Sequence, residues 1–192
     1  MPPTVVWYCR HPPVLLGAEG RPIVPLTADP RLFEAARRLA TLADFFVIPS
    51  NATHLFQAEI AAAAGIPLVS MIEITAEFVR LAGWRRAGVL GLGEPVVHTR
   101  PLGALGIDCE IIDGDARAAL DTAIIKLQEG REDDASRAAA HDAVEALRRR
   151  GVDGIILGCT EIPLLLGAAA DAPDLLNPSQ LLAEAAVREA LR

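Results

Sequence analysis

Two short stretches of this 192-residue sequence place a small polar residue where a predicted strand gives way to a helix. The first is Asp44-Phe-Phe-Val-Ile-Pro-Ser50, and the second is Asp153-Gly-Ile-Ile-Leu-Gly-Cys159. In each stretch an aspartate stands six residues before a side chain that can carry a proton. Because ligands bind at the carboxyl ends of parallel strands, we expect Ser50 and Cys159 to contribute to one site.

Cys159 is the strongest candidate for chemistry. A thiolate there can move a proton or attack a carbonyl carbon, and the N-terminus of a following helix would lower its pKa. The alternative is a buried cysteine that does no chemistry. The next two residues favour a functional role, because Thr160 can bond a ligand carboxylate and Glu161 can hold a backbone group or a ligand amine.

Ser50 has the corresponding position in the first stretch. Its hydroxyl either faces the same ligand or caps a helix, a role that Asn51 can also fill. A hydroxyl is a far weaker acid than a thiol, so proton transfer by Ser50 requires an activating base. The candidate base is His54, four residues further on; the alternative is a histidine that is simply packed or exposed. The remaining histidines look ordinary: His11, His98 and His141.

The composition narrows the class of protein. A net charge of −7 without a basic patch argues against a nucleic-acid partner. The three cysteines are widely spaced, which argues against disulfides or a zinc site and fits a reducing cytoplasm. No apolar run reaches transmembrane length, so we expect no membrane association, and no spacing of His, Asp or Glu suggests a metal site.

Apolar runs and helical periodicity alternate along the chain. Strands are predicted at 4–8, 45–48, 66–71, 87–92, 109–112, 154–157 and 174–177. Helices are predicted at 30 to about 39, 55–64, 96–105, 116–128, 136–150 and 178–192. A further helix is predicted after the strand 66–71 and runs to about residue 82. The segment 14–27 reads as a loop. This alternation predicts an α/β fold with two similar lobes of parallel sheet flanked by helices. The predicted first lobe is 1–82 plus 178–192, and the second is 83–177.

A glycine turn, Gly91-Leu92-Gly93-Glu94, lies between a predicted strand and a helix. It lacks the third glycine of a dinucleotide-binding fingerprint, and no matching acidic residue follows. We therefore interpret it as a turn that cradles a substrate or an anion, and we expect no cofactor.

The stretches Ile48-Pro49-Ser50-Asn51-Ala52-Thr53-His54 and Leu157-Gly158-Cys159-Thr160-Glu161-Ile-Pro-Leu-Leu-Leu166 resemble the two signatures of the aspartate/glutamate racemase family. The resemblance runs from about residue 35 to the end of the chain. It implies a cofactor-independent enzyme whose two α/β lobes each place a cysteine on one face of an amino acid. It also implies that Cys159 is the second-lobe cysteine and that Asn51 and Thr160 hold the substrate carboxylate. The other residues of the signatures would complete the substrate site: Ala52, Thr53, His54 and Glu161.

Three departures from the family pattern matter. Ser50 stands in place of the first-lobe cysteine, and the usual Asn-Thr-Ala-His order reads Asn-Ala-Thr-His. The strand and glycine-rich loop with which family members usually begin are absent, so we expect a second copy of the chain, an upstream segment or the rearranged 14–27 segment to cover the exposed sheet edge. We therefore expect a homodimer. Basic residues that would grip an acidic side chain have no secure counterpart; Arg10 and Gln128 occupy the nearest positions.

Together these features predict a cytoplasmic, racemase-like isomerase that acts on the α-carbon of an aspartate- or glutamate-like amino acid or a related carboxylic acid. Cys159 would be the acid/base, with its sulfur roughly 7 Å from the Ser50 hydroxyl if each side chain approaches the reacting carbon at ~3–3.5 Å. One alternative is a one-cysteine decarboxylase of the same fold, in which Cys159 protonates an enediolate. The others are a non-catalytic protein that binds a small acid and a purely structural domain.

Overall fold

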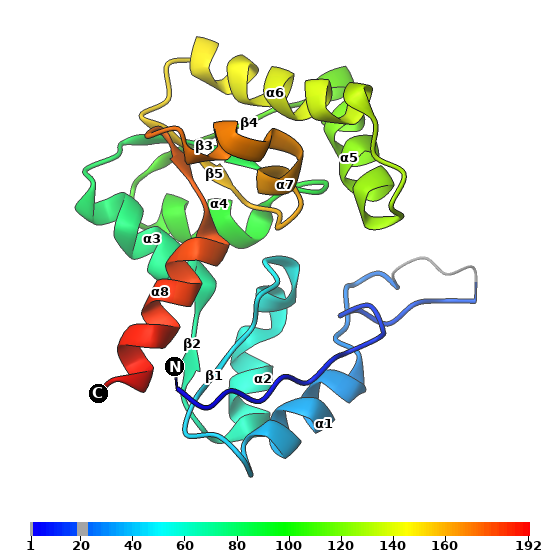
Figure 1. Ribbon diagram of the computed structural model, residues 1–192, viewed down its shortest axis with the longest axis vertical. Coiled ribbons are helices and arrows are strands. Elements are labelled where there is room, and N and C mark those ends of the chain that lie inside the picture. The colour runs from blue at the N-terminus through cyan, green and yellow to red at the C-terminus, as the bar shows by residue number, and fades with distance from the viewer. Residues whose placement is uncertain (1, 19–22) are drawn as a thin grey trace.

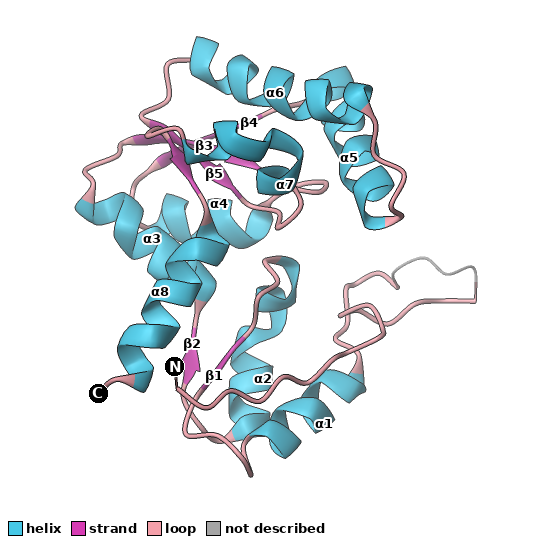
Figure 2. Cartoon of the chain, in the orientation of Figure 1, coloured by secondary structure: helices cyan, strands magenta, loops and turns pink. Residues whose placement is uncertain are grey.

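The computed structural model describes residues 2–18 and 23–192, which contain two parallel sheets flanked by helices (Figures 1 and 2). One sheet has four strands and the other has two. We call the elements around the four-stranded sheet the large lobe and those around the two-stranded sheet the small lobe. All paired strands are parallel, as the alternation of strands and helices predicts.

The large lobe has the strand order β4-β3-β5-β6. Its strands are β3 (Arg86–Leu90), β4 (Asp108–Ile111), β5 (Gly154–Leu157) and β6 (Leu175–Leu176). Its helical elements are α4 (Val96–Ala104), α5 (Gly114–Gln128), α6 (Asp134–Arg149), α7 (Ile162–Leu166) and η2 (Gly167–Asp171).

Strand β5 lies between β3 and β6 and is buried along its whole length. Its side chains alternate between two cores: Ile155 and Leu157 pack against α5, α6 and α7, whereas Ile156 packs against α3 and α4. Because helices pack on both faces of the sheet at β5, every residue of the strand is apolar. The same alternation turns Cys159, beyond the end of β5, toward the core under α7.

The small lobe consists of α1 (Pro30–Leu39), β1 (Phe46–Val47), η1 (Ala52–Phe56), α2 (Gln57–Ala64) and β2 (Leu68–Val69). Its core is small and centres on Phe46, Phe56 and Ile60. Helix α1 begins as predicted, because the Asp29 side chain accepts the backbone N–H of Arg31.

Helices α3 (Met71–Leu81) and α8 (Pro178–Ala190) pack against each other beside both sheets (Figure 1). Ser70 and Asn177 cap them through their side chains. Helix α3 also contributes Ala76 and Val79 to the core under the four-stranded sheet. The lobe limits drawn from the sequence stay a prediction. No helix among the described residues is long and apolar enough to cross a membrane.

The predicted strand at Thr4–Tyr8 is wrong. Within the described part of the chain this segment forms no strand, and the Val6 and Tyr8 residues are 72% and 85% exposed. The Arg38 guanidinium instead lies over the Trp7 ring, with its Cζ atom 5.3 Å from the ring centroid. This cation–π contact holds the segment against α1. Residues with high β-propensity form a strand only beside a partner strand, and this segment has none.

The segment 14–27 is a loop, as predicted, and residues 19–22 of it lie outside the described residues. Its two ends are joined by an antiparallel bridge between Val14 and Ala28, and Val14 packs against the small-lobe core. The loop therefore covers part of the small lobe.

Candidate active site

The turn after β5 permits no side chain at Gly158. The Gly158 N–H donates to the carbonyl oxygen of Leu90 at 2.8 Å. A Cβ atom at Gly158 would lie 2.5 Å from that oxygen and 3.0 Å from Cδ2 of His98. Glycine is therefore required here by close packing, and it places Cys159, half-buried, directly at the carboxyl end of β5.

The Cys159 thiol points at a carboxylate two residues further on. Its Sγ donates to Oε2 of Glu161 at 3.0 Å, and the Thr160 hydroxyl donates to the same oxygen at 2.8 Å. Gln128, at the end of α5, donates to the other carboxylate oxygen at 3.0 Å. Burial alone would raise the pKa of Glu161, but the hydrogen bonds from Cys159, Gln128 and Thr160 outweigh it, so the pKa is lowered and Glu161 is ionised at neutral pH.

The predicted lowering of the Cys159 pKa is wrong. Burial, together with the hydrogen bond to Glu161 and its negative charge, raises the pKa of Cys159 to about 12. The backbone N–H groups of Leu92 and Glu161 act in the opposite direction but are weaker. Helix α7 begins at Ile162 and has only five residues, so it offers little positive potential at its N-terminus. At neutral pH Cys159 is a thiol that can donate a proton.

In the first stretch, Ser50 is half-buried and its hydroxyl accepts a 2.8 Å hydrogen bond from the Thr53 hydroxyl. His54 does not activate this hydroxyl. Its Nε2 accepts the backbone N–H of Met71 at 3.2 Å, so Nδ1 carries the hydrogen and donates to the Ser50 carbonyl oxygen at 2.8 Å. Both ring nitrogens are thus used to hold the turn. Ala52 is exposed.

Asn51 behaves unlike a helix cap. It precedes η1, but its side chain makes no capping hydrogen bond. Its Oδ1 lies 2.8 Å from Nε2 of His98 in the large lobe, and its Nδ2 is buried without a hydrogen-bond partner among the described residues. An unpaired buried donor costs about 1–3 kcal/mol. A ligand that accepts a hydrogen bond, such as a carboxylate, would satisfy the Asn51 amide.

The view of His98 as an ordinary histidine is wrong. This α4 residue is 1% exposed; it bonds Asn51 on one side and contacts the turn at Gly158 on the other. One imidazole ring therefore joins the first stretch to the residue that precedes Cys159. The expected separation of Ser50 and Cys159 remains a prediction.

The glycine turn lies where the sequence places it, between β3 and α4. Gly93 has a positive φ of 64°, and its N–H donates to Asp121 at 2.8 Å. This geometry turns the Leu92 N–H toward the Cys159 sulfur, where it favours the thiolate.

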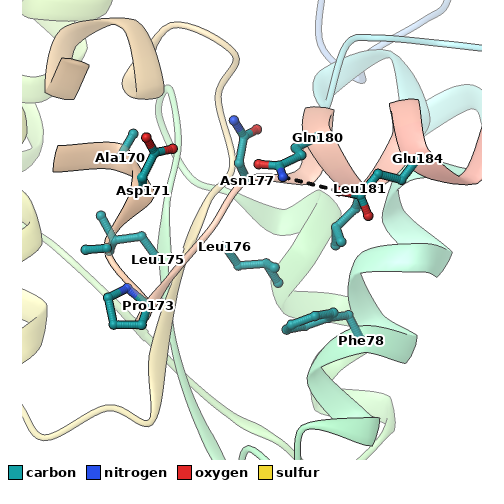
Figure 3. A pocket seen from close by; sticks show the side chains of 11 residues that line it. Phe78, Ala170, Asp171, Pro173, Leu175, Leu176, Asn177, Gln180, Leu181 and Glu184 are labelled. Atoms are coloured by element: carbon teal, nitrogen blue, oxygen red, sulfur yellow. Dashed lines mark hydrogen bonds between the residues drawn. The ribbon is translucent and has the colours of Figure 1, made fainter. Parts of the chain in front are cut away.

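Two cavities lie away from these residues. A cavity of about 430 Å³ is bounded by α3, α8 and the approach to β6, with Phe78, Leu175, Gln180 and Glu184 among its lining residues (Figure 3). A second, of about 270 Å³, lies between the N-terminal segment and α1 and contains Cys9. Neither is lined by a residue of the two signatures. Across residues 2–18 and 23–192, no three His, Cys, Asp or Glu side chains are grouped to hold a metal ion.

The fold and these motifs define a racemase-type protein, and comparison with known proteins names the family. The chain belongs to the Asp/Glu/Hydantoin racemase family, whose sequence profile matches residues 2–186.

Individual relatives agree with this assignment. A glutamate racemase from Desulforudis audaxviator (strain MP104C) is 32% identical over 106 residues, which cover 52% of this chain but only 37% of that protein's length. The structure of a candidate Asp/Glu racemase from Yersinia pestis superposes with a TM-score of 0.75 and 31% identity, covering 85% of this chain and 74% of the other. An aspartate racemase homologue from Pyrococcus horikoshii OT3 gives a TM-score of 0.71 at 20% identity over the same shares, which shows the common fold.

Proposed function

We propose that this chain is a cofactor-independent, racemase-like isomerase that acts on the α-carbon of an amino acid or a related carboxylic acid. The observation that carries the proposal is the Cys159 thiol at the end of β5, hydrogen-bonded to the ionised carboxylate of Glu161. The unpaired Asn51 amide, linked to the same turn through His98, supplies a donor for the substrate carboxylate.

In this mechanism the Cys159 proton first passes to Glu161 along their existing hydrogen bond. The thiolate then takes the α-proton of the substrate, and the electron pair of the C–H bond moves into the carboxylate to give an enediolate. The Asn51 Nδ2–H faces the developing negative charge. Reprotonation from the opposite face falls to the Ser50 hydroxyl, which is slow because it leaves a high-energy alkoxide. The alkoxide then takes a proton from water and Glu161 releases its proton to water, which restores both groups.

A second candidate is a one-cysteine decarboxylase, which the protonated state of Cys159 favours. A malonate-type acid would lose carbon dioxide, the electron pair of the broken C–C bond would form an enediolate, and the Cys159 proton would make the new C–H bond. The resulting thiolate regains a proton from water. This reaction requires neither a second thiol nor an activated Ser50.

The two candidates are separated by incubating the protein with amino acids and substituted malonates in deuterated water. A racemase exchanges the α-hydrogen for deuterium, seen by proton NMR, and a decarboxylase releases carbon dioxide. Cys159→Ser should abolish either reaction, whereas Cys109→Ser, at the far edge strand β4, should not. Thermal stabilisation without turnover would overturn both candidates in favour of a non-catalytic binder.

We also propose that the protein is a homodimer. The apolar residues Val5, Val6 and Tyr8 are more than half exposed, in a segment whose Trp7 lies against Arg38 of α1 in the small lobe. A second copy would remove this surface from water. Light scattering should give twice the mass of the chain, and a monomer at micromolar concentration would contradict the proposal.

A further inference from the structure

His98 holds the side-chain amide of Asn51 in the small lobe from across the lobe boundary. It lies on α4 and is fully buried, and its Nε2 is 2.8 Å from Oδ1 of Asn51, 47 residues earlier in the chain. Burial, followed by the nearby His54, lowers the pKa of His98 to about 4, so the ring is neutral at physiological pH. A neutral imidazole has one N–H, and because Oδ1 can only accept, Nε2 must carry it.

This hydrogen bond couples the orientation of the Asn51 amide to the tautomer of His98. With Oδ1 directed at His98, the Nδ2 hydrogens are left unpaired, ready for a ligand that accepts. If the other ring nitrogen carried the hydrogen, Nε2 would accept from Nδ2, and Asn51 would instead present its oxygen to the ligand. The tautomer of His98 therefore decides whether this position binds a carboxylate or repels it.

The His98 ring also packs against the turn that carries Cys159. Cδ2 and Nε2 of His98 would lie 3.0 Å and 3.4 Å from a Cβ atom at Gly158, which means that the ring packs directly on this glycine before Cys159. Movement of the ring would displace the Asn51 amide and the end of β5 together.

We propose that His98 is a positioning residue that makes the site selective for carboxylates. Its Nε2–H orients Asn51 so that the amide donates to the ligand, and its ring fixes the distance between that amide and the Cys159 turn. The proposal rests on the proposed function for the identity of the ligand. The hydrogen-bond geometry on which it stands is a property of the free protein.

The first test needs no ligand. With ¹⁵N-labelled histidine, long-range proton–nitrogen spectra at pH 7 distinguish a protonated ring nitrogen from a bare one, and the signal lost in His98→Gln identifies the residue. We expect a protonated Nε2 and a bare Nδ1 on His98. A protonated Nδ1 would overturn the proposal even if the enzyme proves to be a racemase.

The second test measures selectivity. L- and D-aspartate and their α-carboxamides are titrated calorimetrically against the wild-type protein, His98→Phe and His98→Gln. We expect the wild type to prefer the carboxylate by at least roughly tenfold, the typical effect of one hydrogen bond to a charged group. His98→Phe should reduce that preference to about twofold or less, because the amide can then turn over. His98→Gln should give an intermediate preference, because its amide can pair with either orientation of Asn51.

His141→Phe, an exposed position on α6, is the matched control and should keep the wild-type preference. An unchanged preference in His98→Phe, with a melting curve showing a folded protein, would overturn the proposal. If no probe binds the wild type, the aspartate-like substrate expected from the sequence fails, and the tautomer measurement still decides the role of His98.

Discussion

Replacement of Glu161 by glutamine should make the Cys159 thiol more acidic. The pKa of Cys159 is raised from its ordinary value of 9.0 to about 12, a difference that corresponds to about 4 kcal/mol. At pH 8 this leaves roughly one thiolate in 10,000 molecules. A glutamine at this position would keep the size of the side chain but remove its charge, and a charged neighbour within about 4–6 Å shifts a pKa by about 1–3 units. Burial is the largest cause of the raised value, so the pKa should fall but stay above its ordinary value.

The assay uses a Cys9→Ser, Cys109→Ser background, in which Cys159 is the single cysteine. Alkylation by iodoacetamide at pH 8 should become roughly tenfold faster or more in Glu161→Gln, and the thiolate absorbance should titrate at lower pH. Glu77→Gln, an exposed carboxylate on α3, is the matched control and should change neither. An unchanged or higher titration midpoint in Glu161→Gln would refute the link between this carboxylate and the thiol.

Three further predictions concern the turn residues and the buried histidine. Ser50→Cys supplies a second thiol, so chiral chromatography should show faster racemisation and deuterium exchange should become more equal between enantiomers; an unchanged bias would mean that Ser50 does not face the substrate. Gly158→Ala should lower the free energy of unfolding in urea by about 1–3 kcal/mol, because its Cβ would lie 2.5 Å from a backbone oxygen. Gly103→Ala, on the open side of α4, should raise it by about 0.5–1 kcal/mol, and equal effects would contradict the packing argument. His98 has a pKa of about 4 when folded and 6.5 when unfolded, so the unfolded state binds the proton first, and stability should fall by about 3 kcal/mol as the pH drops from 6.5 to 4. His98→Phe should flatten this slope. His54 and the carboxyl groups with lowered pKa contribute a slope of the same sign in both proteins, so an unaltered slope would show that His98 is not a titrating group.

The fold could be predicted from the sequence wherever local pattern and tertiary packing agree. Strand β5 matches its prediction at both ends, because a buried strand between two others must be apolar throughout. The helix predicted over 136–150 is also present as α6, which buries Ala140, Ala143, Val144 and Leu147. Thr4–Tyr8 has the composition of a strand but not the structure, because no sequence pattern reveals whether a partner strand is available.

Candidate site residues could be named from the sequence, but their contacts could not. Cys159 and Asn51 come from the two signatures and their roles stay predictions; the structure adds that the His98 ring lies between Asn51 and Gly158, the residue before Cys159. His98 could not be identified, because its importance comes from a partner 47 residues away and from complete burial. The protonation state of Cys159 likewise could not be predicted from the sequence, because it depends on the burial of the thiol and on the direction of the Glu161 carboxylate.

The two-residue strands of the small lobe have a consequence for native-state hydrogen exchange. β1 and β2 pair only with each other among the described strands, over a small core, whereas β5 is flanked on both sides. The amides of β1 and β2 should therefore exchange through local openings, while those of β5 should exchange only when the whole protein unfolds. A ligand held by Asn51 would slow exchange in the small lobe by suppressing its local openings, and it would slow exchange in β5 only as far as it stabilises the whole protein against unfolding. Part of the binding free energy is then used to order the lobe that holds the carboxylate.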